Sequence, residues 1–304
     1  MSAELIAKRN LKFFNDGKPV KGLTLDKARD GFEEALGEAD KDHEIIELYK
    51  SNFSFVTAQH LNFLQENGGN EKLRGLYYQV ILFDLMHNTK TSHFLTAEHL
   101  KELADEQIKN PSKEEKKFFS NPETVNHTVR HRSSETSSIT SALDIMQQFI
   151  QEKGFNGAAT FIDIGSGSGK PILIAMGYNR YRGLFNKACG IDNFLPMKSI
   201  AEENLAKTNI GIDKNKVSFI FEDACKFKDY NGTNAVLMYN PFDADSVEKI
   251  EKKIRKFAGR TILGYIKPKY PEAFLQEENG WSIHNQTNNE DPDKNILIVT
   301  RDFD

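Results

Sequence analysis

The sequence predicts an α/β fold in which a seven-stranded, mostly parallel, doubly wound sheet follows an α-helical domain at the N-terminus. Two observations lead to this prediction. After residue 133, short apolar runs alternate with stretches of helical periodicity, as in a sheet with helices between its strands. Before that residue, apolar side chains recur at the three- and four-residue spacing of amphipathic helices. We therefore expect two domains, residues 1–132 and residues 133–304.

Composition narrows the class of protein. Of the 304 residues, 28% are charged and 38% are hydrophobic, and the net charge is −4, which is typical of a soluble globular protein without general affinity for nucleic acid. No stretch approaches the roughly 20 apolar residues of a membrane span, and no N-terminal apolar run resembles a signal peptide. The two cysteines, Cys189 and Cys225, lack a metal-type spacing. We expect a cytoplasmic protein with reduced thiols, no metal site and no membrane contact.

Four stretches of helical periodicity begin near Thr24, Asp42, Leu73 and Thr96. We interpret their apolar stripes as the core of a helical bundle. A polar connection with a basic cluster at its end follows over residues 110–132. This connection is either a solvated loop or a lid near the substrate.

The stretch from Ala158 to Met176 predicts a strand, a tight turn and a helix. In the turn, glycines alternate with serines from Gly165 to Gly169. Glycine lets a ligand approach the backbone, and the free N–H groups of the helix's first turn point toward that ligand. The stretch therefore predicts a cradle for a polar or anionic ligand.

Three patterns compete for this turn. A dinucleotide fingerprint places its third glycine one position beyond Gly169, where the chain has lysine. A phosphate loop needs glycine and Ser/Thr at positions that hold Ile164 and Pro171. An acidic residue, one spacer and three alternating glycines match without a gap at Asp163, Gly165, Gly167 and Gly169.

This third pattern resembles motif I of the class I S-adenosylmethionine-dependent methyltransferases, and the resemblance covers residues 133–304. It implies a Rossmann-like sheet of the class I type and S-adenosylmethionine as the cofactor. That molecule carries an ammonium and a sulfonium but no phosphate, which favours an acid at the end of the strand. The residues implied to contact it in this stretch are Asp163, Gly165, Ser166, Gly167 and Gly169.

Acids also follow the next two predicted strands, residues 187–192 and 217–221. Asp192, followed by Asn193, lies about 20 residues beyond the glycines, the offset at which an acid accepts hydrogen bonds from a ribose. The resemblance implies that both residues line the cofactor site. It also implies that Asp223 accepts from the adenine amino group and that Ala224 packs near the adenine ring.

A serine- and threonine-rich segment over residues 133–138 precedes another amphipathic helix. Within it, Glu135 and Thr136 resemble the Glu-Thr segment before the corresponding helix in the disruptor-of-silencing type of non-SET protein lysine methyltransferase. In the methyltransferase fold this segment often folds over the cofactor. The resemblance therefore implies that both residues contact the cofactor.

A strongly apolar strand over residues 234–239 runs into Asn240, Pro241 and Phe242. This sequence resembles the Asn-Pro-Pro-Tyr motif of enzymes that methylate planar amino nitrogens. There an asparagine oxygen and a proline carbonyl accept hydrogen bonds from the amine, and an aromatic ring stacks on it. The three residues here are the implied catalytic residues, and Asn240 is also implied to contact the cofactor. The missing second proline disfavours a nucleobase or glutamine acceptor and leaves lysine or another amine.

Three more strands are predicted over residues 260–266, 281–285 and 295–300, the last one antiparallel to the rest because a hairpin connects it. Helices are predicted between the strands over residues 197–209, 246–257 and 271–276.

The predicted function is methyl transfer from S-adenosylmethionine to an acceptor nitrogen, with a lysine or another amine of a protein as the expected acceptor. An in-line transfer needs an aligned approach more than acid–base catalysis. Asp243, Glu135 or solvent could take the proton of the amine. The alternatives are a non-catalytic binding module of the same fold, and a methyltransferase that acts on a small molecule or nucleic acid. An NAD-dependent enzyme is disfavoured by the glycine spacing. The oligomeric state stays open.

Overall fold

The computed structural model describes residues 14–15, 18–19, 21–22, 83–84, 86–91, 136–154, 159–239, 242–287 and 295–302. The chain divides into two compact units, residues 1–92 and residues 93–304. In the first unit, β1 (Phe14–Asn15) pairs antiparallel with β2 (Lys18–Pro19). Phe83, Asp84, Met86 and His87 are helical and belong to the helix predicted from Leu73. The other helices predicted for this region, and the predicted domain boundary at residue 132, lie outside the described residues.

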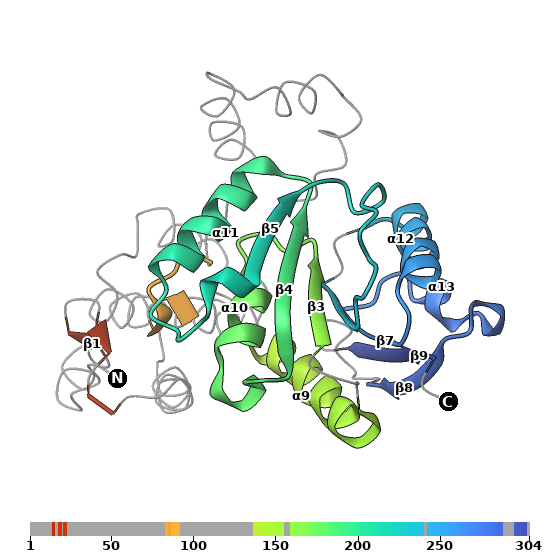
Figure 1. Ribbon diagram of the computed structural model, residues 1–304, viewed down its shortest axis with the longest axis horizontal. Coiled ribbons are helices and arrows are strands. Elements are labelled where there is room, and N and C mark those ends of the chain that lie inside the picture. Colours follow the sequence, from red (N-terminus) through yellow and green to blue (C-terminus); the bar gives the residue numbers. More distant parts are fainter. Residues whose placement is uncertain are drawn as a thin grey trace, which may run out of the picture. The chain divides into compact units, whose positions relative to one another are not determined.

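Seven strands of the second unit form one sheet in the order β5-β4-β3-β6-β7-β9-β8 (Figure 1). Strand β9 is antiparallel to both of its neighbours, and the other neighbouring pairs are parallel. This order, with one reversed strand next to the edge, is that of the class I methyltransferase fold, as predicted. The strands are β3 (Ala159–Ile164), β4 (Phe185–Asp192), β5 (Val217–Phe221), β6 (Ala235–Tyr239), β7 (Thr261–Ile266), β8 (Ser282–Gln286) and β9 (Ile296–Arg301).

Helices connect most of these strands. They are α9 (Thr136–Lys153), α10 (Lys170–Gly177), α11 (Leu195–Lys207), α12 (Ala244–Phe257) and α13 (Glu272–Leu275), with 3-10 turns η1 (Asn179–Tyr181), η2 (Lys214–Lys216) and η3 (Glu277–Asn279). Helix α12 begins two residues earlier than predicted because Asp243 caps it: its Oδ1 accepts a hydrogen bond from the Ser246 N–H at 2.8 Å. Helix α11 also begins early, since Pro196 suits the first turn of a helix.

Helix α9 runs opposite to β7 along one face of the sheet. Near the middle of the helix, Met146 Sδ lies 3.1 Å from the position that a Cβ would take at Gly264 of β7. Beyond its C-terminal end, the carbonyl oxygen of Gly154 accepts a hydrogen bond from Arg260, directly before β7, at 3.5 Å. Because a helix advances about 1.5 Å per residue, Thr136 at its other end lies at the carboxyl end of the strands.

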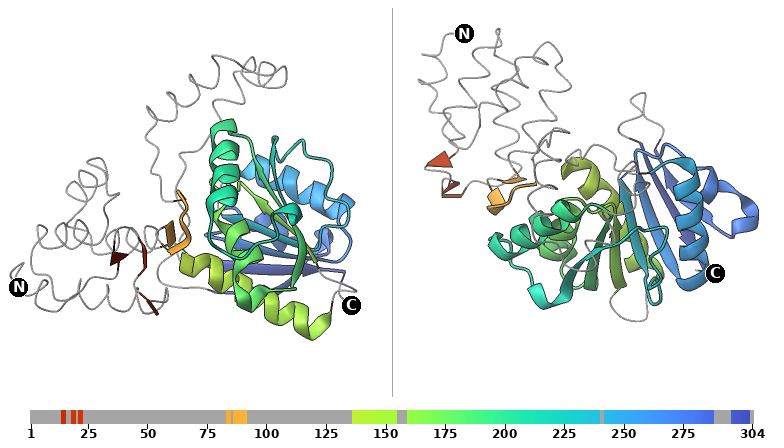
Figure 2. Two further views of the ribbon diagram at one scale, coloured as in Figure 1. Left: turned by 60° about the vertical axis from the view of Figure 1, so that its left-hand side comes forward. Right: turned by 90° about the horizontal axis from the view of Figure 1, so that it is seen from above.

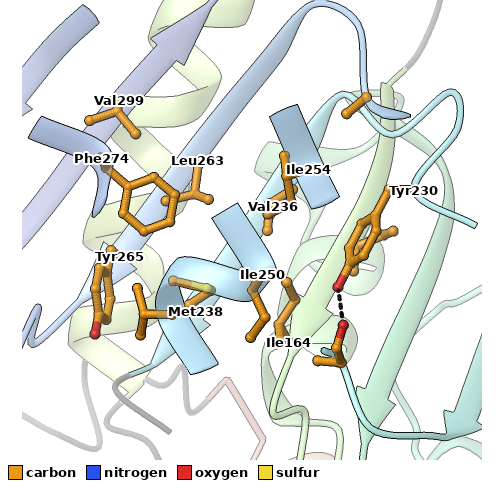
Figure 3. Close-up of a cluster of buried hydrophobic side chains, with 14 of the residues drawn as sticks. Ile164, Tyr230, Val236, Met238, Ile250, Ile254, Leu263, Tyr265, Phe274 and Val299 are labelled. Carbon is orange, nitrogen blue, oxygen red and sulfur yellow. Dashed lines mark hydrogen bonds between the residues drawn. The ribbon is translucent and has the colours of Figure 1, made fainter. Parts of the chain in front are cut away.

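The opposite face of the sheet packs against α12. Side chains of β6 and β7, among them Val236 and Leu263, form a buried cluster with Ile250 and Ile254 of α12 (Figure 3). Helices therefore cover both faces, as expected for a doubly wound sheet (Figure 2). Within the part of the chain that the structure describes, every helix is too short or too polar to cross a bilayer.

Candidate functional site

The glycine-rich turn lies where a doubly wound sheet binds its ligands. Such ligands sit beyond the carboxyl ends of the strands at the point where the strand order reverses, which here is between β3 and β6. The turn follows β3 directly and leads into α10. The topology therefore places the predicted cofactor residues at the position where this fold binds small molecules.

All three glycines of the turn adopt positive φ angles. The values are 75° at Gly165, 49° at Gly167 and 83° at Gly169, a region that side chains with a Cβ rarely occupy. The N–H groups of Gly165 and Ser166 both donate to the carbonyl oxygen of Ile191, at 2.8 and 3.0 Å, which fixes the turn against β4. The glycines are thus required by the shape of the turn itself.

Close packing beneath the turn requires two glycines. A Cβ at Gly169 would lie 2.8 Å from Cζ of Phe219 on β5. A Cβ at Gly190 on β4 would lie 2.6 Å from the same ring and 2.7 Å from Oγ of Ser166, which is buried. The sequence analysis did not single out Gly190, although a glycine inside a strand often marks such a close approach.

The carboxylate of Asp192 closes over the turn from the end of β4. Its Oδ2 accepts from the Gly167 N–H and its Oδ1 from the Phe194 N–H, both at 2.8 Å. Burial raises the pKa of Asp192 to about 6, although these two amide donors act in the opposite direction. Each oxygen has a second lone pair, so the group can still accept from a ribose hydroxyl. Asn193, the next residue, is partly buried.

Asp163 lies deeper, with 1% of its surface exposed. Its Oδ2 has no hydrogen-bond partner among the described residues. Burial, and then the negative charge of Asp192, raise the pKa of Asp163 well above its ordinary value. A buried carboxylate oxygen without a partner is costly, and a cationic ligand would offset that cost.

Asp223 and Ala224 follow β5, as predicted. The Asp223 Oδ1 accepts from the Cys225 N–H at 2.9 Å, and the carbonyl oxygen of the buried Ala224 accepts from the Tyr230 hydroxyl at 3.2 Å. The N–H of Glu222 donates to the carbonyl oxygen of Asp192 at 3.0 Å, so the ends of β4 and β5 lie together. The structure thus brings the predicted acids to neighbouring strand ends, and their contacts with adenine and ribose stay predictions.

Thr136 opens α9 at the same end of the sheet. Its Oγ1 is buried and has no hydrogen-bond partner among the described residues. Together with Asp163, it leaves two buried oxygens that a ligand with N–H or O–H groups can satisfy. These features fit S-adenosylmethionine, which has an ammonium and ribose hydroxyls. Glu135, directly before Thr136, lies outside the described residues.

The predicted acceptor tip is described only in part, because Asn240 and Pro241 lie outside the described residues. Phe242 is partly buried and packs against the cluster beneath α12. Asp243 has a structural role as the cap of α12. Among the residues that the structure describes, no group of histidine, cysteine and carboxylate side chains could hold a metal ion.

No protein-family model matches the sequence. No curated protein matches it either. Among solved structures, the chain is similar to magnesium protoporphyrin IX methyltransferase from Synechocystis PCC 6803 with bound S-adenosylmethionine (14% identity, 54% of this chain, 79% of that chain, TM-score 0.40). It is also similar to precorrin-6y C5,15-methyltransferase from Geobacter metallireducens (12% identity, 57% of this chain, 92% of that chain, TM-score 0.40). A third similar structure is a glycopeptide N-methyltransferase complexed with S-adenosylmethionine (10% identity, 54% of this chain, 93% of that chain, TM-score 0.39). At such low identities and scores, the assignment of the class I methyltransferase fold depends on the strand order and the reversed strand described above.

Proposed function

We propose that the protein is an enzyme that transfers a methyl group from S-adenosylmethionine to an acceptor nitrogen, with a lysine or another amine of a protein as the acceptor. One observation carries the proposal. Asp163, whose buried Oδ2 has no hydrogen-bond partner among the described residues, and the glycine turn lie at the point where the strand order reverses, and the neighbouring strand β4 ends in Asp192. An acid pair above a glycine turn suits a cationic nucleoside and does not suit a pyrophosphate.

In the proposed reaction, residues of this chain bind the cofactor and orient it. In this proposal Asp163 and Thr136 bind the polar groups of the cofactor's amino-acid part, and Asp192 binds its ribose. Bound S-adenosylmethionine supplies an activated methyl group on its sulfonium, and the acceptor nitrogen forms the new bond to carbon as the bond from sulfur breaks. Alignment of nitrogen, carbon and sulfur lowers the barrier of such a transfer, because the reacting groups no longer have to be oriented during the reaction.

The acceptor amine must lose a proton before it attacks. Asn240 and Pro241 are proposed to accept its N–H groups and Phe242 to pack against it. Because the Asp243 carboxylate already caps α12, solvent is the simplest proton acceptor among the candidates. Residues 1–132 are proposed to form a separate helical domain.

Calorimetry with S-adenosylmethionine tests the cofactor assignment. We expect Asp163→Ala and Gly167→Arg to abolish binding while the protein stays folded, because the first removes the buried acid and the second fills the cradle. Gly259→Arg is a matched control, since Gly259 has open space around its Cα and lies directly before Arg260, at the amino end of β7. Unchanged affinity in both site variants would refute the assignment.

Two further measurements separate the alternatives. A rise in melting temperature with S-adenosylhomocysteine, but not with NAD, would exclude the dinucleotide enzyme. Labelled methyl donor with fractionated lysate then distinguishes an enzyme from a binding module, because only an enzyme forms S-adenosylhomocysteine. Loss of the label from the macromolecular fraction on protease treatment, but not on nuclease treatment, would identify a protein acceptor.

A further inference from the structure

Strand β8 is the last strand of the sheet in the described part of the chain. It pairs with β9 alone, so its other edge has no neighbouring strand among the described residues (Figure 1). Asn285 is partly buried, and the other residues of the strand are exposed. An open edge of this kind presents backbone N–H and C=O groups, which makes it a template for pairing with a further strand.

The hydrogen bonds to β9 show which way the backbone of Gln286 points. The Thr287 N–H donates to the Ile296 carbonyl oxygen at 3.0 Å, and Gln286 lies opposite Leu297. Along an antiparallel pair, residues that bond to the neighbouring strand alternate with residues that do not. The N–H and C=O of Gln286 therefore point away from β9, toward the open edge.

Exposed apolar side chains border this edge. Ile283 is 55% exposed and lies opposite Val299, a member of the cluster beneath α12, so it lies on the α12 face of the sheet. Leu275 of α13 is 37% exposed. Its neighbour Phe274 packs against Trp281, directly before β8, with ring centroids 5.5 Å apart. The start of β8 and α13 thus form an apolar border on this face.

Charge distinguishes the two edges of the sheet. Residues 279–289, which include β8, contain no Asp, Glu, Lys or Arg, although 28% of the chain is charged. At the opposite edge, Lys214 and Lys216 lie just before β5, and Ser218 is exposed while the other residues of that strand are buried or partly buried. Lysines and burial protect an edge from pairing. The edge at β8 lacks both kinds of protection.

A bulge at His284 limits the length of the regular edge. The register with β9 shifts between Ile283 and Asn285, which leaves His284 as the extra residue. Its ring packs against Phe149 of α9, with ring centroids 4.6 Å apart. Because a bulge interrupts a regular ladder, β8 suits a short pairing between two strands and does not suit an extended stack of sheets.

We propose that β8 pairs antiparallel with β8 of a second copy of this chain, which joins the two sheets and forms a symmetric dimer. A two-fold axis brings each strand against its own sequence, so charged residues would face like charges, which destabilise a strand pair. A neutral strand avoids that repulsion and has no charge with which to select a different protein. The protected edge at β5 prevents further growth, so the assembly closes at two copies.

The dimer keeps the two candidate cofactor sites apart. Antiparallel pairing directs the carboxyl ends of the parallel strands to opposite sides of the joined sheet, and the glycine turn follows the carboxyl end of β3 in each copy. The inference is therefore independent of the proposed methyl transfer. Loss of the dimer should leave cofactor binding unchanged.

Sedimentation velocity at increasing protein concentration tests the pairing, with Ile283→Lys as the variant. We expect the wild type to change from monomer to dimer, and the variant to have at least a tenfold higher dissociation constant, because a lysine in the edge strand makes the copies repel each other. Asn231→Lys is the matched control. Asn231 is exposed and lies before β6, which β7 and β9 separate from β8. This control adds the same charge and should dimerise like the wild type.

Two further measurements keep the test decisive if Ile283→Lys lowers the urea midpoint. Gln286→Pro removes the outward N–H at an edge position, where proline is tolerated, and should also weaken the dimer. In the wild type, amides of residues 282–286 should exchange their hydrogens more slowly at high protein concentration than at low concentration. A wild type that stays monomeric, a dimer that both edge variants leave intact, or equal weakening in Asn231→Lys would overturn the proposal.

Discussion

Gly190 shows how a single residue links the sheet to the site. It lies inside β4, where the Phe219 ring and the Ser166 side chain leave no space for a Cβ. Phe219 also contacts the position of Gly169, so one aromatic ring supports both the strand and the glycine turn. A side chain at residue 190 would therefore displace the turn on which the proposed cofactor binds.

We predict that Gly190→Ala destabilises the protein by about 1–3 kcal/mol, the usual cost of overpacking. It should also reduce the rise in melting temperature that S-adenosylhomocysteine causes. The control is Gly259→Ala, because nothing lies within 4 Å of the added Cβ and the φ angle is not positive. This control should be neutral or slightly stabilising in urea unfolding. Equal effects at the two positions would contradict the packing argument.

The residues of the site differ in how well the sequence predicts them. The glycine turn and Asp192 could be predicted because each belongs to a local pattern: a spacing of glycines, or an acid that ends a strand. Gly190 could not, because its role comes from contacts with residues far along the chain. The sequence also could not show that Asp192 binds the backbone of the turn, since that contact needs β3 and β4 to be side by side.

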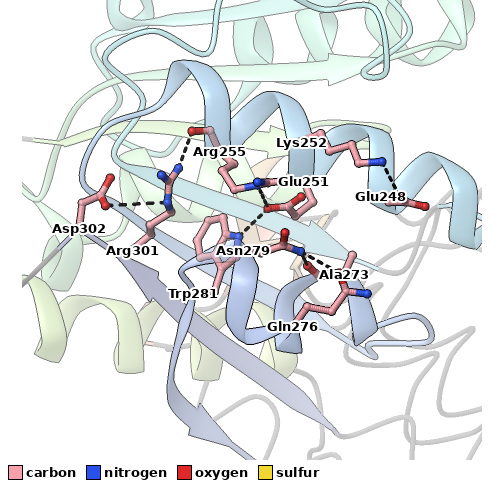
Figure 4. Close-up of polar contacts among 10 residues, drawn as sticks. All are labelled: Glu248, Glu251, Lys252, Arg255, Ala273, Gln276, Asn279, Trp281, Arg301 and Asp302. Carbon is pink, nitrogen blue, oxygen red and sulfur yellow. Dashed lines mark hydrogen bonds and ion pairs between the residues drawn. The ribbon is translucent and has the colours of Figure 1, made fainter.

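At the scale of elements, a buried carboxylate connects α12 to the segment directly before β8. Glu251 is 0% exposed, and its Oε1 accepts from Trp281 Nε1 at 2.8 Å and from Arg255 Nε at 2.9 Å (Figure 4). Arg301 of β9 in turn donates to the Arg255 carbonyl oxygen. Glu251 thus holds α12 against the segment before β8, and Arg301 holds the last strand against α12.

We predict that Glu251→Ala lowers the free energy of unfolding by about 2 kcal/mol or more, because it leaves the buried Trp281 N–H without its partner. Glu248→Ala is the control on the same helix, where an exposed glutamate pairs with Lys252 at the i, i+4 spacing. This control should leave urea unfolding nearly unchanged, since exposed pairs contribute little. A loss of stability of similar size in both variants would show that helix propensity, and not the buried contact, is responsible.

The sequence predicted the elements better than their ends. Strand β5 has its predicted bounds, and the other strands begin and end within two residues of the prediction. Alternating apolar residues define where a strand exists, but its ends depend on neighbours: β4 begins at Phe185 because that ring is buried against Phe161, with ring centroids 4.8 Å apart. The helix ends likewise depended on caps such as Asp243.

At the scale of the second unit, the topology brings Asp163 and Asp192 together although a helix and a strand separate them in the sequence. Burial raises the pKa of Asp192 to about 6, and burial with the charge of Asp192 raises the pKa of Asp163 further above its usual range. In the unfolded chain both groups return to about 3.9. The folded chain therefore binds more protons than the unfolded chain in weak acid, which makes its stability depend on pH.

Because the folded state binds more protons, the contribution of these two carboxyl groups to stability falls as the pH rises from about 4 through about 6, and for Asp163 beyond that. We predict that Asp163→Asn raises the urea midpoint of the ligand-free protein near pH 8 and changes it less near pH 5. Exposed Asp229→Asn should shift neither value. S-adenosylmethionine, a cation, should flatten the pH dependence of the wild type more than neutral S-adenosylhomocysteine, since its charge favours both ionised carboxylates. An Asp163→Asn variant whose stability follows the wild-type pH curve would contradict the assignment of that acid to a cationic ligand.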